Sequence, residues 1–229
     1  MRWLVVSLIS ISMLALNAGP VEAEKFRIST DTSDQARVLV PLIEEVYRRI
    51  GHEAEVVFLP PLRSLKSSNS GEFDAELLRT TTGVVEYPNL VQVPEPLFVA
   101  SVSAIVQEGS DISEATWETV GKHSIVYPRG YLLIDARTRG MNATVASKPI
   151  RIANMIAGGR ADIGIVLTHD ARKFASEMAS LHVIEPPIET VVLYHYVHFK
   201  HRRLVPLLEG VLIEMYKSGE AQEILQSAQ

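Results

Sequence analysis

The sequence predicts an α/β protein of two lobes, each a mostly parallel sheet flanked by helices, joined by a double-stranded hinge. After its first 23 residues the chain runs through a strand, an amphipathic helix and a second strand, and a similar alternation resumes after the polar segment 108–118. Strands that alternate with helices are typical of parallel sheets with crossover helices. Two long apolar extended stretches, 97–107 and 189–200, join the two units and predict the hinge.

The first unit begins with the strand 26–30 and a helix whose apolar side chains recur every three or four residues. These side chains are Leu39, Leu42, Ile43, Val46, Tyr47 and Ile50. Gly51 stands where a left-handed residue ends a helix, and the strand 53–59 follows. Pro60-Pro61 then turns the chain into a short helix, 62–70, and a strand, 73–78.

The second unit follows the first crossing, in which three prolines between residues 88 and 96 lead into the strand 97–106. Pro149 and Gly158-Gly159 mark the start and the end of one of its helices. We predict, in order, strand 124–127, helix 131–139, strand 144–146, helix 149–157, strand 161–167, helix 169–179 and strand 182–184.

The tail after the second crossing is an amphipathic helix that stops at Ser218-Gly219 and then resumes. Because the two crossings carry the chain out of the first unit and back, we predict that 24–101 plus 196–229 form lobe 1. Residues 102–195 then form lobe 2.

The composition excludes several classes of protein. The chain has 229 residues, 47% of them hydrophobic and 21% charged, which argues against a disordered or collagen-like chain. Its 22 basic and 27 acidic residues give a net charge of −5 with no long run of one sign, so nucleic acid is not an expected partner. No residue is Cys, which excludes disulfide scaffolds, thiolate zinc sites and cysteine nucleophiles.

The first 23 residues have the pattern of a cleavable signal peptide. Arg2 gives a positive start, the stretch 4–16 is apolar, and Val21-Glu22-Ala23 is a small-x-small cleavage site. The 13 residues of that stretch would span about 20 Å as a helix, short of the roughly 30 Å hydrocarbon core, which argues against a membrane anchor. We expect cleavage after Ala23 and a periplasmic location.

Four short motifs resemble those of the periplasmic solute-binding proteins of family 3, the polar amino-acid uptake group. They are Phe26-Arg27-Ile28-Ser29-Thr30-Asp31, Gly71-Glu72-Phe73-Asp74-Ala75-Glu76, Pro94-Glu95-Pro96-Leu97 and Gly159-Arg160-Ala161-Asp162. The resemblance extends over nearly all of 24–229. It is nearest to short, divergent transporter-substrate-binding-like members of the family. In these members a Pro-rich turn with Arg precedes a Gly-x-x-Asp-x-Glu-x-x-Arg run, as in 71–79 here. It implies the two-lobed type II periplasmic binding fold.

Three arginines at predicted strand-to-helix turns are candidate ligand-binding residues: Arg63, Arg79 and Arg129. In such folds these turns face the cleft between the lobes. A buried anionic or zwitterionic solute needs a charge partner, and the planar fork of Arg can hold a carboxylate with two parallel hydrogen bonds. A solvated surface arginine or a structural ion pair is the alternative for each.

Three more residues complete the predicted site. Asp31 could receive an amine or cap a helix, since 31–34 is rich in N-cap residues. Glu76 stands in a short apolar strand and needs a partner, for which Arg79 or Arg63 would serve. Tyr131 could stack on a ligand or simply pack. We expect Arg79→Ala to abolish stabilisation by the ligand and to leave the empty protein nearly intact.

Two departures from the family put an α-amino acid ligand in doubt. The place of the family's carboxylate-binding Arg reads Val85-Glu86-Tyr87-Pro88, and Val166-Leu167-Thr168 fills the place of its amine-binding Asp. Asp170 comes later, and Arg79 and Asp170 could take over by a shifted geometry. No motif for catalysis is present, and His195, His198 and His201 alternate faces if extended, so we expect no enzyme, no cofactor and no metal site.

These features lead to three hypotheses of different classes. The first is a monomeric extracytoplasmic protein that captures a small polar solute, zwitterionic or anionic and amino-acid-like, for ABC-type uptake by an inner-membrane permease. The second is a ligand-sensing periplasmic protein of the same fold that signals to a membrane receptor or kinase. The third is a dehydratase-like enzyme, which would need a general acid or base such as Glu76 or His169 near the cleft.

Overall fold

The computed structural model describes residues 23–228. The predicted signal peptide, 1–23, lies outside this part of the chain except for Ala23. No helix between residues 23 and 228 has the length and apolar character needed to cross a bilayer.

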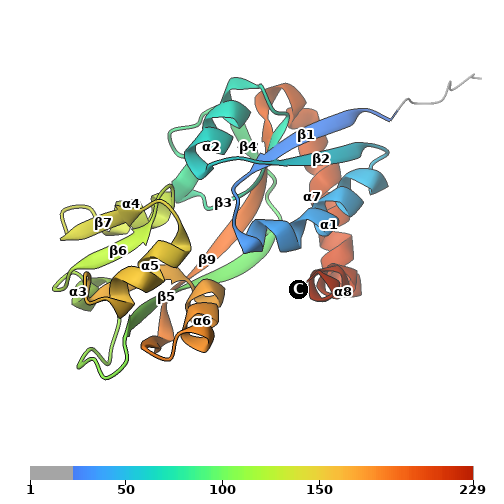
Figure 1. Cartoon of the computed structure of the whole chain (residues 1–229). Helices are drawn as coiled ribbons and strands as arrows, with labels where there is room; N and C mark the ends of the chain where they lie inside the picture. The colour runs from blue at the N-terminus through green and yellow to red at the C-terminus, as the bar shows by residue number, and fades with distance from the viewer. Residues whose placement is uncertain (1–22, 229) are drawn as a thin grey trace, which may run out of the picture.

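The first half of the molecule is a sheet in which three parallel strands lie in the order β2-β1-β3. Helices α1 and α2 connect these strands, and α7 and α8 from the end of the chain pack beside α1 (Figure 1). The elements are β1 (Lys25–Thr30), α1 (Asp34–Arg49), β2 (Glu53–Phe58), α2 (Pro61–Ser70), β3 (Ala75–Arg79), α7 (Val205–Ser218) and α8 (Glu220–Ser227).

Local chemistry explains why α1 begins and ends where it does. The Ser33 side chain accepts a hydrogen bond from the Ala36 amide and so caps the helix N-terminus. The buried face of the helix carries Leu39 and Tyr47, as the sequence periodicity predicts. Gly51 follows the last turn with φ of +83°, the left-handed conformation that glycine adopts without a steric penalty.

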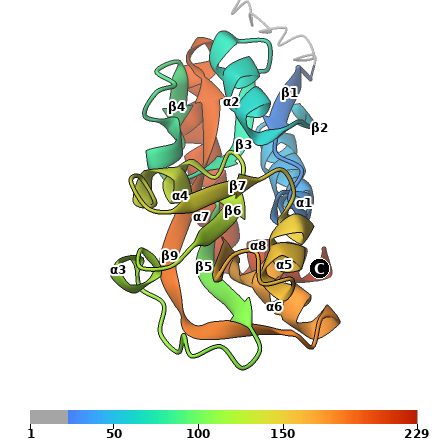
Figure 2. The same cartoon turned by 60° about the vertical axis from the view of Figure 1, so that its left-hand side comes forward.

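The second half repeats the parallel arrangement with the strand order β8-β6-β7. Its helices α4 and α5 lie near β6 and β7, and α6 lies beside β5 and β9 (Figure 2). The elements are α3 (Trp117–Val120), β6 (Ile125–Pro128), α4 (Leu132–Arg137), β7 (Ala143–Ala146), α5 (Pro149–Ala157), β8 (Ile163–Leu167) and α6 (Thr168–Glu177).

Two long antiparallel strands, β5 (Phe98–Gln107) and β9 (Leu181–His198), run through both halves. Strand β9 pairs with β3 at one end, and β5 pairs with β8 at the other, so one continuous sheet links the halves. The short strand β4 (Leu90–Gln92), within the stretch expected to be an extended connection, pairs with the end of β9.

One expectation about these strands was wrong. The sequence predicted separate strands at 182–184 and 189–200, but β9 is continuous. Its pairing with β5 shifts register between Val102, opposite Glu189, and Ala104, opposite Ile184. The Pro186-Pro187 pair lies in this irregular segment, where proline's missing amide is tolerated.

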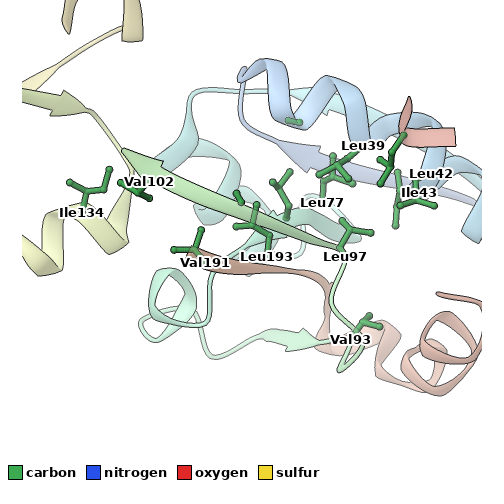
Figure 3. Close-up of a cluster of buried hydrophobic side chains, with 14 of the residues drawn as sticks. Leu39, Leu42, Ile43, Leu77, Val93, Leu97, Val102, Ile134, Val191 and Leu193 are labelled. Atoms are coloured by element: carbon green, nitrogen blue, oxygen red, sulfur yellow. The ribbon is translucent and has the colours of Figure 1, made fainter. Parts of the chain in front are cut away.

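A continuous apolar core follows the two long strands. Figure 3 shows Leu193 of β9 near Leu77 of β3 and Leu97, the residue before β5, while Ile134 of α4 lies farther along the two long strands. All four side chains are buried. The two halves therefore meet across packed side chains, and the turns at the ends of β1, β3 and β6 face one another above them.

Candidate functional site

A pocket lies between the two halves of the molecule, with a cavity volume of about 80 Å³. The first half contributes the β1–α1 turn and the residues after β3, the second half contributes the β6–α4 turn, and the long strands form the floor. Its lining consists of Asp31, Ser33, Gln35, Leu78, Arg79, Thr80, Gly83, Val102, Gly130, Tyr131, Leu132, Leu133, Ile134, Leu167, Val191 and Leu193.

Three of the predicted site residues meet in one buried ion-pair cluster, Asp31–Arg79–Glu76. The Nη1 atom of Arg79 donates to Oδ2 of Asp31 at 2.6 Å, and Nη2 lies 2.7 Å from Oε1 of Glu76. Nη2 also donates to the carbonyl oxygen of Pro61 at 3.3 Å. The exposed fractions are 7% for Asp31, 9% for Arg79 and 0% for Glu76, so solvent screens these charges little.

Three serines surround the other oxygen of Glu76. The hydroxyls of Ser64, Ser29 and Ser68 lie 2.5, 2.9 and 3.2 Å from Oε2. Sequence reasoning missed these serines, although Ser64 and Ser68 stand four residues apart and therefore share one face of α2. The sequence signal that could have found them is a row of polar residues on one face of a helix.

The cluster has two carboxyl groups and one guanidinium. Burial raises the pKa of Glu76, against the opposing effects of Arg79 and the serines. Burial also acts to raise the pKa of Asp31, but Arg79 and the Ser33 hydrogen bonds outweigh it and leave that pKa lowered. Arg79 has a raised pKa because Glu76 and Asp31 outweigh its own desolvation, so it stays charged.

Tyr131 approaches the cluster from the other half of the molecule. It directly precedes α4 and lines the same pocket as Asp31 and Arg79. Burial raises the pKa of its phenol, and Asp31, Asp170 and Asp34 raise it further while Arg79 opposes them. The hydroxyl therefore stays protonated.

The other two predicted arginines are solvent-exposed. Arg63, on α2, does not line this pocket. Arg129 borders a smaller neighbouring cavity together with Asp31 and Tyr131. The structure thus brings together Asp31, Glu76, Arg79 and Tyr131, places Arg129 at the edge of that group, and leaves Arg63 apart from it.

A second charged cluster joins the halves between α1 and α6. Asp34 Oδ2 lies 3.3 Å from Lys173 Nζ and 3.9 Å from His169 Nε2, and His169 lies 3.6 Å from Asp170. Asp34, His169 and Asp170 have their ligand atoms within 4.8 Å of one another, a spacing that could suit a metal ion. The Lys173 ammonium on Asp34 would repel such a cation.

Gly130 allows the two halves to approach closely beside the pocket. It has φ of +85°, and a Cβ at this position would lie 2.7 Å from Cβ of Pro61 in the other half. Real Cβ atoms do not approach so closely, so any larger residue forces the halves apart.

We expect Gly130→Ala to weaken binding of any solute held between the halves by about tenfold or more, because overpacking costs about 1–3 kcal/mol in the closed arrangement. Isothermal titration with a bound solute measures this. Gly140→Ala is the matched control: Gly140 has φ of +83° but nothing within 4 Å of the added Cβ. Equal affinities of the two variants would contradict the role of the Pro61 contact.

Comparison with known proteins gives matches among solved structures alone. No family model and no curated protein matches the sequence. An arginine-binding protein mutant from T. maritima has 17% identity and a TM-score of 0.74 over 89% of this chain and 94% of that one. An amino acid ABC transporter substrate-binding protein from Streptococcus pneumoniae, bound to L-arginine, has 14% identity and a TM-score of 0.72 over 89% and 94%.

A histidine kinase sensor domain with similarity to periplasmic binding proteins has 13% identity and a TM-score of 0.77, and the match covers 90% of this chain and 96% of that one. Likeness at these identities shows the fold. The chain has the two-lobed α/β fold of periplasmic binding proteins, as the sequence motifs predict.

Proposed function

We propose that the protein is an extracytoplasmic solute-binding protein that captures a small polar solute between its lobes for ABC-type uptake. The observation that carries this proposal is the pocket lined by residues of both halves, most of them apolar and a few of them polar or charged. Ligand pockets have this composition: a largely apolar wall and a few placed polar groups.

The mechanism we propose is closure about the two long strands β5 and β9, with the lobes bounded at 101/102 and 195/196. Closure removes water from the pocket, which strengthens the polar contacts inside it. Tyr131 and Gly130 come from one lobe and Asp31 and Arg79 from the other, so a bound solute would hold the lobes together. The closed form then differs in shape from the empty form, and a permease can recognise this difference.

Sensing is the second candidate function, because a histidine kinase sensor domain matches this fold over 90% of the chain. The same closure would then be read by a membrane receptor or kinase instead of a permease. Uptake of a labelled solute by cells with and without the gene separates the two. Loss of uptake supports transport, whereas unchanged uptake with a lost transcriptional response supports sensing.

Thermal-shift screening of residues 24–229 against amino acids, peptides, carboxylates, amines and sugars tests solute capture. A solute with micromolar affinity at a hundredfold excess adds about 2.7 kcal/mol of stability, which raises the melting temperature by several degrees. A hit whose shift is reduced in Gly130→Ala and retained in Gly140→Ala supports capture between the lobes. No shift with any compound would count against solute capture.

A further inference from the structure

The two charged side chains that line the pocket are paired with each other. They are Asp31 and Arg79, and Nη1 of Arg79 donates to Oδ2 of Asp31 at 2.6 Å. The other oxygen of Asp31 accepts from the Ser33 amide at 2.9 Å. Nη2 of Arg79 lies 2.7 Å from Glu76, which does not line the pocket, and donates to the Pro61 carbonyl at 3.3 Å. Each charge of the pocket therefore has its partner within the protein.

A ligand carboxylate would find no free pair of N–H groups in this pocket. An arginine holds a carboxylate best through two parallel N–H groups, and both amino groups of Arg79 are engaged by acceptors of the protein. The Nε atom has no hydrogen-bond partner, but it is buried from solvent and offers a single N–H. The ligand carboxylate would also lie beside that of Asp31. Burying an anion without its own cation is strongly destabilising.

A ligand ammonium meets the opposite charge of the same ion pair. Both oxygens of Asp31 already accept hydrogen bonds, and the guanidinium of Arg79 lies against this carboxylate. An ammonium brought to Asp31 would therefore lie next to a second cation, and it would leave water without a partner of its own. A zwitterion needs a free partner of each sign, so the ion pair disfavours both of its ends.

The uncharged polar side chains of the lining are free to bind a ligand. Among the hydrogen bonds of residues 23–228, none engages the Tyr131 hydroxyl or the Gln35 amide, and both side chains line the pocket. The Thr80 hydroxyl accepts from the Gly83 amide at 3.1 Å and keeps its own O–H to donate. Hydroxyl and amide groups both donate and accept hydrogen bonds. The pocket thus offers uncharged donors and acceptors to a hydroxyl, carbonyl or amide group.

The rest of the pocket fits a small apolar body. Figure 3 shows four of its apolar side chains: Val102 on β5, Val191 and Leu193 on β9, and Ile134 on α4. The cavity volume of about 80 Å³ has room for on the order of five water molecules, if one water needs about 15 Å³ on this measure. The pocket therefore suits a compact molecule, whose apolar surface gains by leaving water.

On the basis of the solute-capture function, we propose that the solute is a small uncharged molecule with an apolar body and a hydroxyl, carbonyl or amide group. The pairing of Arg79 with Asp31 excludes charged ligands, and Tyr131 and Gln35 hold the uncharged polar group. This differs from the zwitterionic or anionic solute that the sequence suggested, because the sequence did not reveal that Arg79 is paired from within.

Matched compounds that share one body test the proposal. We would titrate the wild-type protein at neutral pH with isobutanol, isobutyramide, isobutyrate and isobutylamine, and with the four corresponding butyl compounds. We expect at least one alcohol or amide to bind about tenfold or more tightly than the carboxylate and the amine of the same body, a difference of about 1.4 kcal/mol.

Two results of these titrations would overturn the proposal. Tighter binding of a carboxylate or an amine would overturn the uncharged class and leave solute capture intact. Binding of none of the eight compounds would overturn the assignment of a compact uncharged solute, whereas solute capture itself is decided by the wider thermal-shift screen.

The variant Asp31→Asn tests whether the ion pair sets this selectivity. Asparagine keeps the shape of the side chain and removes its charge, which leaves Arg79 with one acidic partner fewer. Affinity for isobutyrate should rise about tenfold or more relative to isobutyramide. Asp111→Asn is the matched control: it makes the same change of charge at an exposed position and should keep the wild-type ratio. An unchanged ratio in a folded Asp31→Asn protein would refute the role of the ion pair, and the wild-type titrations decide the ligand class if this variant does not fold.

Discussion

Arg79→Met is expected to lower the free energy of unfolding by about 3–5 kcal/mol at pH 7, because removing one partner of a buried ion pair leaves an uncompensated charge. Here the loss affects two carboxylates, since Arg79 contacts both Asp31 and Glu76. The same geometry revises the expectation that Arg79→Ala leaves the empty protein nearly intact. Urea unfolding followed by circular dichroism measures the change.

Two further variants show whether the loss comes from the ion pairs. Arg63→Met removes an exposed arginine of the first half and is expected to change stability by less than about 0.5 kcal/mol. Adding Glu76→Gln to Arg79→Met removes one of the stranded charges and should restore part of the loss, so the double-mutant cycle has a measurable coupling. An Arg79→Met protein as stable as the wild type would refute the structural role of the cluster.

The second large effect is a loss of stability on acidification that comes from His195. This side chain is fully buried on β9; its Nδ1 donates to the Leu77 carbonyl at 3.1 Å, and its Nε2 accepts from the Tyr47 hydroxyl at 3.0 Å. Burial lowers its pKa from 6.5 to about 4. The neutral ring is therefore part of the folded core.

The sign follows from proton binding. Between pH 6.5 and about 4 the unfolded chain binds a proton at His195 and the folded protein does not, so stability is fully present above pH 6.5 and falls as the pH drops through this window. The loss approaches about 3 kcal/mol at its lower end. Below pH 4 the lowered pKa of Asp31 adds to it. The raised pKa of Glu76 acts in the opposite direction above its ordinary value of 4.5, and so offsets part of the loss within the His195 window.

Urea unfolding at half-unit steps from pH 7.5 to 4 measures this dependence. Glutamine does not titrate. In His195→Gln the slope of unfolding free energy against pH, between pH 6.5 and 4, should therefore be smaller than in the wild type, whatever the stability of the variant at pH 7. His182→Gln changes an exposed histidine and should keep the wild-type slope. Equal slopes of unfolding free energy against pH in His195→Gln and the wild type would contradict the assigned state of His195.

The alternation of strands and helices was predictable because it depends on local chemistry. The apolar face of α1, the glycine after it and the prolines at the first turns of α2 and α5 each stand at the position that the sequence indicates. The break expected before residue 189 was wrong, since pairing with β5 on both sides of the Pro186-Pro187 segment keeps β9 a single strand. A partner strand is not visible in a local pattern.

The sequence by itself determined the α/β class, the two crossing strands and the residue types that a polar site needs, because periodicity, capping residues and turn residues act over a few positions. Only the tertiary structure decided which of those residues meet. It engaged Arg79, at the end of β3, with Asp31 and Glu76 and left Arg63, in the first turn of α2, in solvent, although the sequence placed both arginines at strand-to-helix turns. The physical reason is that an ion pair between residues 48 positions apart depends on how the strands are ordered in the sheet.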